Sequence, residues 1–306
     1  MIKSMRSPQN TPQNTPNFFE YIPYPHLASP KLDGVRGSIQ GNNVLSSTLA
    51  ALPNWNLQER FRQSTLCGLQ GEFVMGPAYA PDVFNKTMST VMAANKPVEG
   101  LIFAVFDHVT EETRNLPFET RLESARALVK AFGQSHVVMV PQREIANYEE
   151  LVEFEEEMLL RGYEGVMIRC MDSPYKEGRA TLREASIFKL KRLEDSEGVV
   201  VGFDTGRHNT NPQERSEEGR AKRSYAAEGL IDSDMVGALL VEFHGQQIRV
   251  APGKFKHHER RDMLQHPSDY IGRYVKFTHM PHGAKDQPRM ARAVGWRDPR
   301  DMAIND

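Results

Sequence analysis

The sequence has few cysteines and no long apolar run. Its 306 residues include only two cysteines, Cys67 and Cys170, which lie too far apart in the chain to form a CxxC metal-binding pair. So few cysteines favour a reducing compartment, and we expect a cytoplasmic protein. No stretch approaches the roughly 20 apolar residues that a membrane span requires, so we expect no membrane partner. The first residues also lack the apolar core of a secretory signal peptide.

The sequence also lacks a strong overall charge, because its formal net charge is only −2. A total this balanced produces no global field that would attract nucleic acid. The charge is uneven along the chain, however, since residues 198–306 carry 17 Lys and Arg against 15 Asp and Glu. This small excess favours an anionic partner for the C-terminal part.

Short apolar stretches alternate with helical patterns through the first two thirds of the chain. Apolar side chains recur at helical spacing in residues 117–133 and 147–162. Strands are predicted at residues 68–76, 101–109, 136–145, 165–170 and 186–194. These elements predict an α+β domain of mixed sheets and helices over residues 24–196. The Gln-, Asn-, Thr- and Pro-rich residues 1–23 are predicted to form a flexible arm.

After residue 196 the pattern changes to short strands separated by glycine-rich breaks. Five such strands and one helical stretch, residues 255–266, predict a small β-barrel of the OB-fold type over residues 197–306. Between the first two strands lies a long polar segment, residues 204–229, which has no clear periodicity and is predicted to be a loop. A loop of this length in a compact domain is either functional or disordered.

The stretch SPKLDGVRG at residues 29–37 places Lys31, Asp33 and Arg36 within six residues. A deprotonated lysine amine can attack an electrophilic phosphorus, and an arginine fork can grip a phosphate. Glycine allows the backbone to approach such a group closely. The same residues could equally form a surface turn with an ion pair of little energetic value. From this stretch alone, the surface turn is the better interpretation.

Four further stretches carry side chains that suit a nucleoside triphosphate. LQGEF contains Glu72, FAVFDHV contains Phe106 and EGVMIR contains Glu164. FKLK places Lys189 and Lys191 two residues apart, and hence on one face of a strand. Carboxylates can hold a hard divalent cation or a ribose hydroxyl, an aromatic ring can stack on a base, and lysines can neutralise phosphate charge. Each residue taken singly also has an ordinary structural explanation.

Together and in this order, the five stretches resemble motifs I, III, IIIa, IV and V of the covalent nucleotidyltransferase superfamily, which contains ATP-dependent DNA ligases and mRNA capping enzymes. KLDGVR matches the KxDGxR pattern of motif I in full. The C-terminal part is similar to that of small phage and viral DNA ligases, so the resemblance covers nearly the whole chain after about Tyr24. It implies a nucleotidyltransferase domain of ATP-grasp-like architecture followed by an OB-fold domain.

The resemblance implies a role for each motif residue. Lys31 would be the nucleophile that takes AMP from ATP, and Asp33 would lie beside a DNA nick, near the metal or the terminal hydroxyl. Glu164 would be the main metal ligand, and Glu72 would bind the metal or the ribose. The cation would be Mg²⁺, with Mn²⁺ as an alternative. The remaining nucleotide contacts would come from Ser29, Arg36, Phe106, Lys189 and Lys191.

The sequence departs from the family pattern at three places. Gln70 stands where an acidic residue is usual, and Ser47 stands where an arginine is frequent, so that a phosphate contact is missing or supplied elsewhere. The usual RxDK motif near the C-terminus is absent in that form. The candidates for a contact with the β,γ-phosphates are instead Arg289, Arg292 and Arg297.

The long polar segment offers candidates for contact with a DNA backbone. These are Arg220, Lys222 and Arg223. Sequence-independent binding of DNA relies on phosphate contacts. Neighbouring glutamates largely offset this charge, so a salt-bridged surface segment explains the same residues equally well.

The resemblance predicts an ATP-dependent DNA ligase that joins a 3′-hydroxyl to a 5′-phosphate in nicked duplex DNA through lysyl-AMP. We expect a monomer that acts in DNA replication, repair or recombination. One alternative is a GTP-dependent mRNA capping enzyme, which usually has DGxIF where this chain has EGVMIR. An RNA ligase of the same superfamily is a second alternative. A non-catalytic nick-binding protein is a third, against which the intact motif residues argue.

Overall fold

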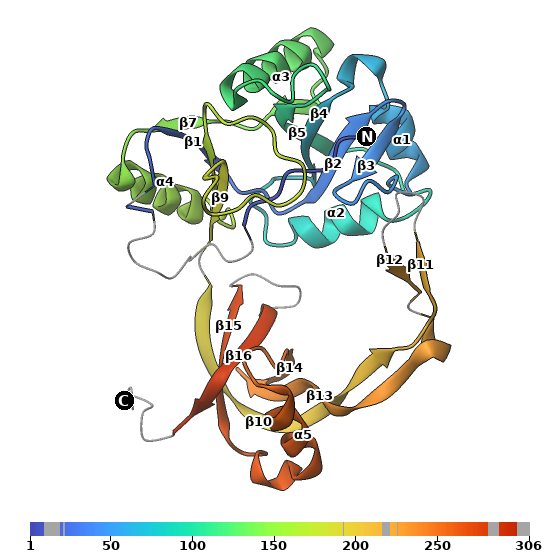
Figure 1. Cartoon of the computed structure of the whole chain (residues 1–306), viewed down its shortest axis with the longest axis vertical. Coiled ribbons are helices and arrows are strands. Elements are labelled where there is room, and N and C mark those ends of the chain that lie inside the picture. Colours follow the sequence, from blue (N-terminus) through green and yellow to red (C-terminus); the bar gives the residue numbers. More distant parts are fainter. Residues whose placement is uncertain are drawn as a thin grey trace. The chain divides into compact units, whose positions relative to one another are not determined.

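The computed structural model describes residues 1–8, 19–20, 22–191, 193–215, 221–224, 226–280 and 288–298 (Figure 1). The chain divides into two compact units, Met1–Arg192 and Leu193–Asp306, each with its own apolar core. The boundary that we predicted after Ser196 falls inside strand β10 (Glu194–Asn209). Among the described residues, no helix is long and apolar enough to cross a membrane.

The first unit contains a four-stranded antiparallel sheet, here called the β8 sheet. Its strand order is β7-β1-β8-β9. The bounds are β1 (His26–Pro30), β7 (Arg143–Ile145), β8 (Val166–Cys170) and β9 (Ile187–Leu190). Helix α4 (Tyr148–Leu160) contributes Leu151, Phe154 and Met158 to the core beneath this sheet. The helix begins where predicted, because the side chain of Asn147 accepts a hydrogen bond from the Glu150 amide and caps it.

The second sheet of this unit, here called the β4 sheet, has the order β3-β2-β4-β5-β6. Its strands are β2 (Val35–Gln40), β3 (Asn43–Ser46), β4 (Leu69–Met75), β5 (Leu101–His108) and β6 (Val137–Met139). The helices of this half are α1 (Trp55–Phe61), η1 (Ser64–Leu66), α2 (Val83–Val91) and α3 (Phe118–Phe132). Apolar residues of α1, α2 and α3 share one core with the sheet. Helix α3 was predicted, and it ends at Gly133, whose φ of 67° suits a left-handed C-cap.

One predicted strand is wrong in its extent. Residues 136–145 form two strands, β6 and β7, that belong to different sheets. Pro141 lies between them and cannot donate a ladder hydrogen bond, so the chain leaves one sheet there and joins the other.

The first eight residues pack on this unit, although they belong to the arm (residues 1–23) that we predicted to be flexible. Ile2 and Met5 are buried in a cluster with Tyr175 and Ile187. The composition that suggested flexibility is concentrated in residues 9–18, which lie outside the described residues, as does Tyr21. The segment 1–8 instead carries two apolar side chains that gain from burial.

The second unit is a five-stranded antiparallel sheet of order β14-β13-β10-β15-β16. Besides β10, its strands are β13 (Leu230–Phe243), β14 (Gln246–Val250), β15 (Tyr274–Met280) and β16 (Arg289–Arg297). Helix α5 (His257–Gln265) adds Met263 to the core, and the short helices are η2 (Ala227–Gly229) and η3 (Pro267–Asp269). Across the described residues, the edge strands meet only through the Ala251–Arg292 bridge. The expected barrel is therefore an open one, as OB-folds can be.

The loop predicted at residues 204–229 is wrong at residues 204–209, 213–215 and 221–223, which form strands. Strands β10 and β13 pair as far as Asn209 and Leu230, and β11 (Gln213–Arg215) pairs with β12 (Ala221–Arg223). Residues 216–220 between them lie outside the described part. A two-stranded ribbon held by backbone hydrogen bonds needs no apolar face, so the hydrophobic alternation that reveals other strands is missing here.

Candidate active site

Lys31 follows directly after β1, where the chain passes the start of β8. Because β1 and β8 pair with Pro30 opposite Val166, Lys31 lies beside the turn that carries Glu164. The Lys31 amide donates a hydrogen bond to the Gly165 carbonyl at 2.8 Å. Gly165 has a φ of 143°, and a Cβ there would lie 2.2 Å from the Leu190 carbonyl oxygen. Only glycine fits this approach between two strands.

Glu164 joins two of the predicted lysines in one cluster. Its Oε2 accepts from the Lys31 ammonium, and its Oε1 lies 3.1 Å from the Lys191 Nζ. Burial by itself would raise the pKa of Glu164, but the positive charges of Lys31 and Lys191 outweigh this effect and lower the pKa. Glu164 is therefore a carboxylate that holds both ammonium groups in place.

Lys189 and Ser29 lie on the same sheet as this cluster. Met167 of β8 pairs with Ser29 of β1 on one side and with Lys189 of β9 on the other, so only β8 separates Ser29 from Lys189. Burial lowers the pKa of Lys189, and the nearby charges of Lys191 and Lys31 lower it further. The arrangement concentrates positive charge at this edge of the β8 sheet.

The β4 sheet supplies Arg36, Glu72 and Phe106. Arg36 and Glu72 are cross-strand neighbours on β2 and β4. Burial raises the pKa of Glu72 to about 7, although Arg36 and Lys31 act in the opposite direction. The Arg36 guanidinium lies 4.3 Å from the centre of the Phe106 ring and donates to the Gln70 side-chain oxygen at 2.7 Å. Arg36 thereby covers a face of the aromatic ring.

Gly34 allows the chain at the start of β2 to approach β4 closely. A Cβ at Gly34 would lie 2.1 Å from the Phe73 carbonyl oxygen of β4. The glycine of the KLDGVR stretch is thus required by packing between β2 and β4, independently of any bound phosphate.

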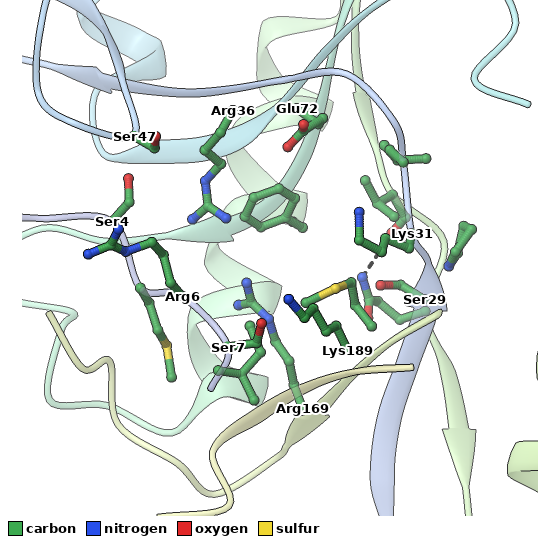
Figure 2. A pocket seen from close by; sticks show the side chains of 18 of the residues that line it. Ser4, Arg6, Ser7, Ser29, Lys31, Arg36, Ser47, Glu72, Arg169 and Lys189 are labelled. Atoms are coloured by element: carbon green, nitrogen blue, oxygen red, sulfur yellow. Dashed lines mark hydrogen bonds between the residues drawn. The ribbon is translucent and has the colours of Figure 1, made fainter. Parts of the chain in front are cut away.

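A cavity of about 350 Å³ lies between these two groups of residues. Figure 2 shows Arg36 and Glu72 projecting from one side, with Ser29, Lys31 and Lys189 on another. The charged residues that line it comprise one carboxylate and six cations, namely Glu72, Arg6, Lys31, Arg36, Arg169, Arg179 and Lys189. Phe106 also lines it. A hollow with this charge balance and an aromatic wall suits an anionic ligand that carries a planar base.

Residues 15–191 match a family model described as ATP dependent DNA ligase domain, which spans more than half of the chain. The chain belongs to the ATP-dependent DNA ligase family. Residues 232–297 match a second model, described as DNA ligase OB-like domain. The predicted family and the predicted fold class, an α+β nucleotidyltransferase domain followed by an OB-fold domain, are confirmed.

Other DNA ligases are similar to this chain in sequence or in structure. The DNA ligase of African swine fever virus (isolate Tick/South Africa/Pretoriuskop Pr4/1996) is 27% identical over 111 residues, which are 35% of this chain and 26% of the viral protein. The match therefore spans about a quarter of that relative's length. A solved structure from a study of Lig E DNA ligases has a TM-score of 0.71 and covers 97% of this chain and 100% of its own, at 22% identity, so it shows the fold. The Chlorella virus DNA ligase-adenylate is 26% identical with the same coverage and a TM-score of 0.52.

Asp33 lies in the turn between β1 and β2 and does not line the cavity of this ligase-family chain. It is half-buried, and its negative charge is close enough to contribute to the raised pKa of Glu72. The structure therefore places Asp33 beside the predicted nucleotide site and not within it.

The predicted residues of the second unit lie on β16 and on the β11–β12 ribbon. Arg297 of β16 forms an ion pair with Glu197 of β10, and Arg292 and Arg289 lie on the same strand. Arg223 of the ribbon donates to the carbonyl of Asn209, the last residue of β10, at 2.7 Å. Arg220 lies outside the described residues, and so does the side chain of Lys222.

Sequence reasoning missed several cavity residues in this ligase-family chain. Arg169 lines the cavity, where its guanidinium lies 5.1 Å from the Phe106 ring centre. It donates to the buried Asp107 at 2.8 Å, and Arg121 of α3 donates to the same carboxylate at 3.0 Å. The arginine of EGVMIR and the Phe-Asp pair of FAVFDHV were visible signals for this contact. Arg6 and Arg179 belong to no motif that would have revealed them.

Two carboxylates of the site, Glu72 and Glu164, have the chemistry to hold a divalent cation. Within the described part of the chain, no group of three or more His, Cys, Asp or Glu side chains is arranged to hold a metal ion. Mg²⁺ usually binds through one or two carboxylates and completes its shell with water and phosphate oxygens. Glu72 and Glu164, which are near enough for the charge of Glu164 to raise the pKa of Glu72, fit that requirement.

Proposed function

We propose that this chain is an ATP-dependent DNA ligase that seals nicks between a 3′-hydroxyl and a 5′-phosphate in duplex DNA. One observation carries the proposal: the cavity of the first unit brings together Lys31, Arg36, Glu72, Phe106 and Lys189, five residues that are separated by up to 158 positions and belong to two sheets. A surface ion pair at Lys31 would not require this convergence.

In the first step, the Lys31 Nζ loses a proton and attacks the α-phosphorus of ATP. A nitrogen–phosphorus bond forms, the bond to the bridging oxygen breaks, and pyrophosphate leaves. Glu164 orients the lysine until the proton departs, and Lys189 and Lys191 stabilise the charge that builds on the α-phosphate. Mg²⁺ or Mn²⁺, held by Glu164 with Glu72, would supply further stabilisation of phosphate charge.

Adenine binding would use the aromatic wall of the cavity. Phe106 stacks on the base, with Ser29 near its edge. The Arg36 guanidinium lies 4.3 Å from the centre of the Phe106 ring, next to the proposed base, and is assigned to a phosphate of the nucleotide. A guanidinium binds a phosphate through charge-assisted hydrogen bonds.

The later steps transfer AMP from Lys31 to the 5′-phosphate of a nick and then join the strand. The 3′-hydroxyl attacks the activated phosphorus, a phosphodiester bond forms, and AMP leaves. Asp33 is assigned to the side of the nick. Arg289, Arg292 and Arg297 are assigned to the β,γ-phosphates of ATP, and Arg220, Lys222 and Arg223 to the DNA backbone. The chain is proposed to act as a monomer.

The test is incubation with ATP labelled at the α-phosphorus and Mg²⁺, followed by denaturing electrophoresis. The wild-type protein should retain label, Lys31→Ala should retain none, and Lys130→Ala, an exposed lysine of α3, serves as the matched control. Equal labelling of Lys31→Ala would remove the nucleophile assignment. Labelling by GTP in place of ATP would favour a capping enzyme, and sealing of nicked RNA alone would favour an RNA ligase. Binding of nicks without any AMP transfer would show a non-catalytic protein.

A further inference from the structure

The segment 1–8 forms part of the wall of the predicted ATP cavity. Its residues Ser4, Met5, Arg6 and Ser7 line the cavity together with the motif residues. The Arg6 backbone is held on both sides, since its amide donates to the Gly178 carbonyl at 2.7 Å and its carbonyl accepts from the Ala180 amide at 2.8 Å. The position of Arg6 is therefore fixed by the segment before β9.

Specific contacts also hold the segment on the N-terminal side of Arg6. The amide of Ile2 donates to the Gln40 side-chain oxygen at 2.7 Å, and the Gln40 amide group returns a bond to the Ile2 carbonyl at 2.8 Å. The Met5 amide donates to the Tyr175 hydroxyl at 2.6 Å. Met5 is buried with 2% of its surface exposed, so the segment is anchored by apolar burial as well as by hydrogen bonds.

The guanidinium of Arg6 is available to a ligand. Within the described residues, no hydrogen bond or ion pair engages it, whereas Arg36 and Arg169 are bound to Gln70 and Asp107. Figure 2 shows Arg6 toward the same end of the cavity as Ser47. A guanidinium offers a planar fork of donors that matches a phosphate group.

Ser47 lines the same cavity and carries no charge. In the ligase family that the sequence motifs resemble, an arginine is frequent at this position. The segment between β3 and α1 therefore adds no cation to the cavity at Ser47, whereas Arg6 brings one to it from a different part of the chain.

The segment is also connected to Arg36. The Tyr175 hydroxyl that accepts from Met5 lies 2.9 Å from the Gln70 side-chain oxygen, and that oxygen accepts from Arg36. An uncharged Gln70 receives both contacts and leaves the Arg36 charge unneutralised. The backbone of the segment and a phosphate-binding motif residue therefore share one hydrogen-bonded chain.

We propose that Arg6 is a phosphate-binding residue of this enzyme and supplies the contact that Ser47 does not make. The inference rests on the proposed ligase function. The ligand is a phosphate group at the end of the cavity that Arg6 and Ser47 line, and two sources present it: the triphosphate of ATP in the first step and the 5′-phosphate of the nick in the second.

Two single-turnover measurements distinguish these sources. The first follows transfer of label from ATP to the protein, and the second follows transfer of AMP from labelled protein to nicked DNA. Arg6→Ala should slow at least one of them by about tenfold to a hundredfold, the effect expected for loss of a charge-assisted hydrogen bond. Lys3→Ala, which removes a charge from the same segment but not from the cavity, should stay within twofold of the wild-type rate. The slowed step identifies the source.

A substitution at position 47 separates a phosphate contact from a structural effect. If both residues serve one ligand, the double variant Arg6→Ala with Ser47→Arg should recover most of the rate lost in Arg6→Ala. Recovery through a side chain on a different element would not occur if Arg6 only stabilised the segment. Thermal melting of all variants checks that they are folded.

The proposal is overturned if Arg6→Ala and Lys3→Ala have equal rates in both measurements, or if Ser47→Arg restores nothing. Should Arg6→Ala fail to fold, Arg6→Lys decides, because it keeps the charge and loses the planar fork. It should be several-fold slower in the affected step, and a rate equal to wild type contradicts the inference. Failure of the wild-type protein to take label from ATP would instead refute the ligase proposal itself.

Discussion

Glu72 exchanges its proton in a different pH range from an ordinary glutamate. Burial raises its pKa to about 7 from a reference value of 4.5, against the influence of Arg36 and Lys31. The folded protein therefore binds this proton more tightly than the unfolded chain. The stability that results is fully present below about pH 4.5 and is lost as the pH rises through about 7.

Replacing Glu72 by glutamine should therefore stabilise the protein at high pH. Because the pKa rises from 4.5 to about 7, the gain in the free energy of unfolding is on the order of 3 kcal/mol at pH 8.5, and it should vanish near pH 4.5. Thermal melting of the wild-type protein and of Glu72→Gln between pH 5 and 8.5 measures this difference, with Glu123→Gln on the exposed face of α3 as control. A difference that stays constant with pH would contradict the raised pKa.

Asp107 is fully buried and is the counter-charge of two buried arginines, Arg121 and Arg169. Asp107→Asn keeps the shape but removes the negative charge, so two guanidiniums would remain buried without compensation. We expect a loss of about 3–5 kcal/mol in the free energy of unfolding, measured by urea denaturation followed by far-UV circular dichroism. In the control, Asp82→Asn, which breaks an exposed pair with Lys86, the loss should stay below about 1 kcal/mol. Equal effects of the two substitutions would show that the buried cluster is not stabilising.

At the scale of elements, two helix caps of the same residue type differ in their surroundings. The Asn54 side chain caps α1 by accepting from the Leu57 amide at 3.0 Å, and it also donates to the carbonyls of Thr90 and Lys96. Asn54 is fully buried, whereas Asn147 caps α4 at an exposed position.

Alanine should therefore destabilise the protein more at Asn54 than at Asn147. Loss of a cap costs about 1 kcal/mol, which we expect for Asn147→Ala. Asn54→Ala also removes the two hydrogen bonds that the Asn54 side chain donates to the carbonyls of Thr90 and Lys96, at about 0.5–1.5 kcal/mol each. Urea denaturation of the two variants compares these losses directly. Equal losses for Asn54→Ala and Asn147→Ala would show that these two additional hydrogen bonds do not contribute to stability.

The elements that sequence predicted well are those with one buried face. Helices α3 and α4 show apolar spacing and clear ends, and the motif strands are short apolar runs. The β11–β12 ribbon was missed because a solvent-exposed ladder leaves no mark in the pattern of side chains. Helix α1, with seven residues, is too short to show a helical period.

For the whole molecule, the two units have separate apolar cores, and they differ in secondary structure. Four of the five described α-helices lie in the first unit, so the helical signal comes mainly from that unit. Trp296 lies in the second unit, where its ring packs against Tyr270 and Phe255. In a Trp55→Phe variant, which leaves one of the two tryptophans, fluorescence reports on the second unit, and far-UV circular dichroism reports mainly on the first. We expect the two signals to change at different urea concentrations. A single coincident transition would show that the units unfold together.

The candidate site could be predicted where local motifs carry it. KLDGVR, LQGEF and the other stretches name residues whose roles follow from the resemblance, and the structure brings six of the nucleotide-site residues to one cavity, namely Ser29, Lys31, Arg36, Glu72, Phe106 and Lys189. Arg6 could not be found in this way, because its place depends on a contact with Gly178 and Ala180, more than 170 positions away. Long-range pairing of this kind leaves no local signal.

The ion pairs of Asp107 have a consequence for the opening of the cavity. Asp107 belongs to β5 in the β4 sheet and Arg169 to β8 in the β8 sheet, so one buried carboxylate ties the two walls together. Separating the walls would expose or strand this buried charge, at a cost of about 3–5 kcal/mol. Amide hydrogens of β5 and β8 should consequently exchange with solvent deuterium at the same slow rate. The two walls therefore keep their spacing, and the movement that admits a nucleotide is expected from the side chains that line the cavity.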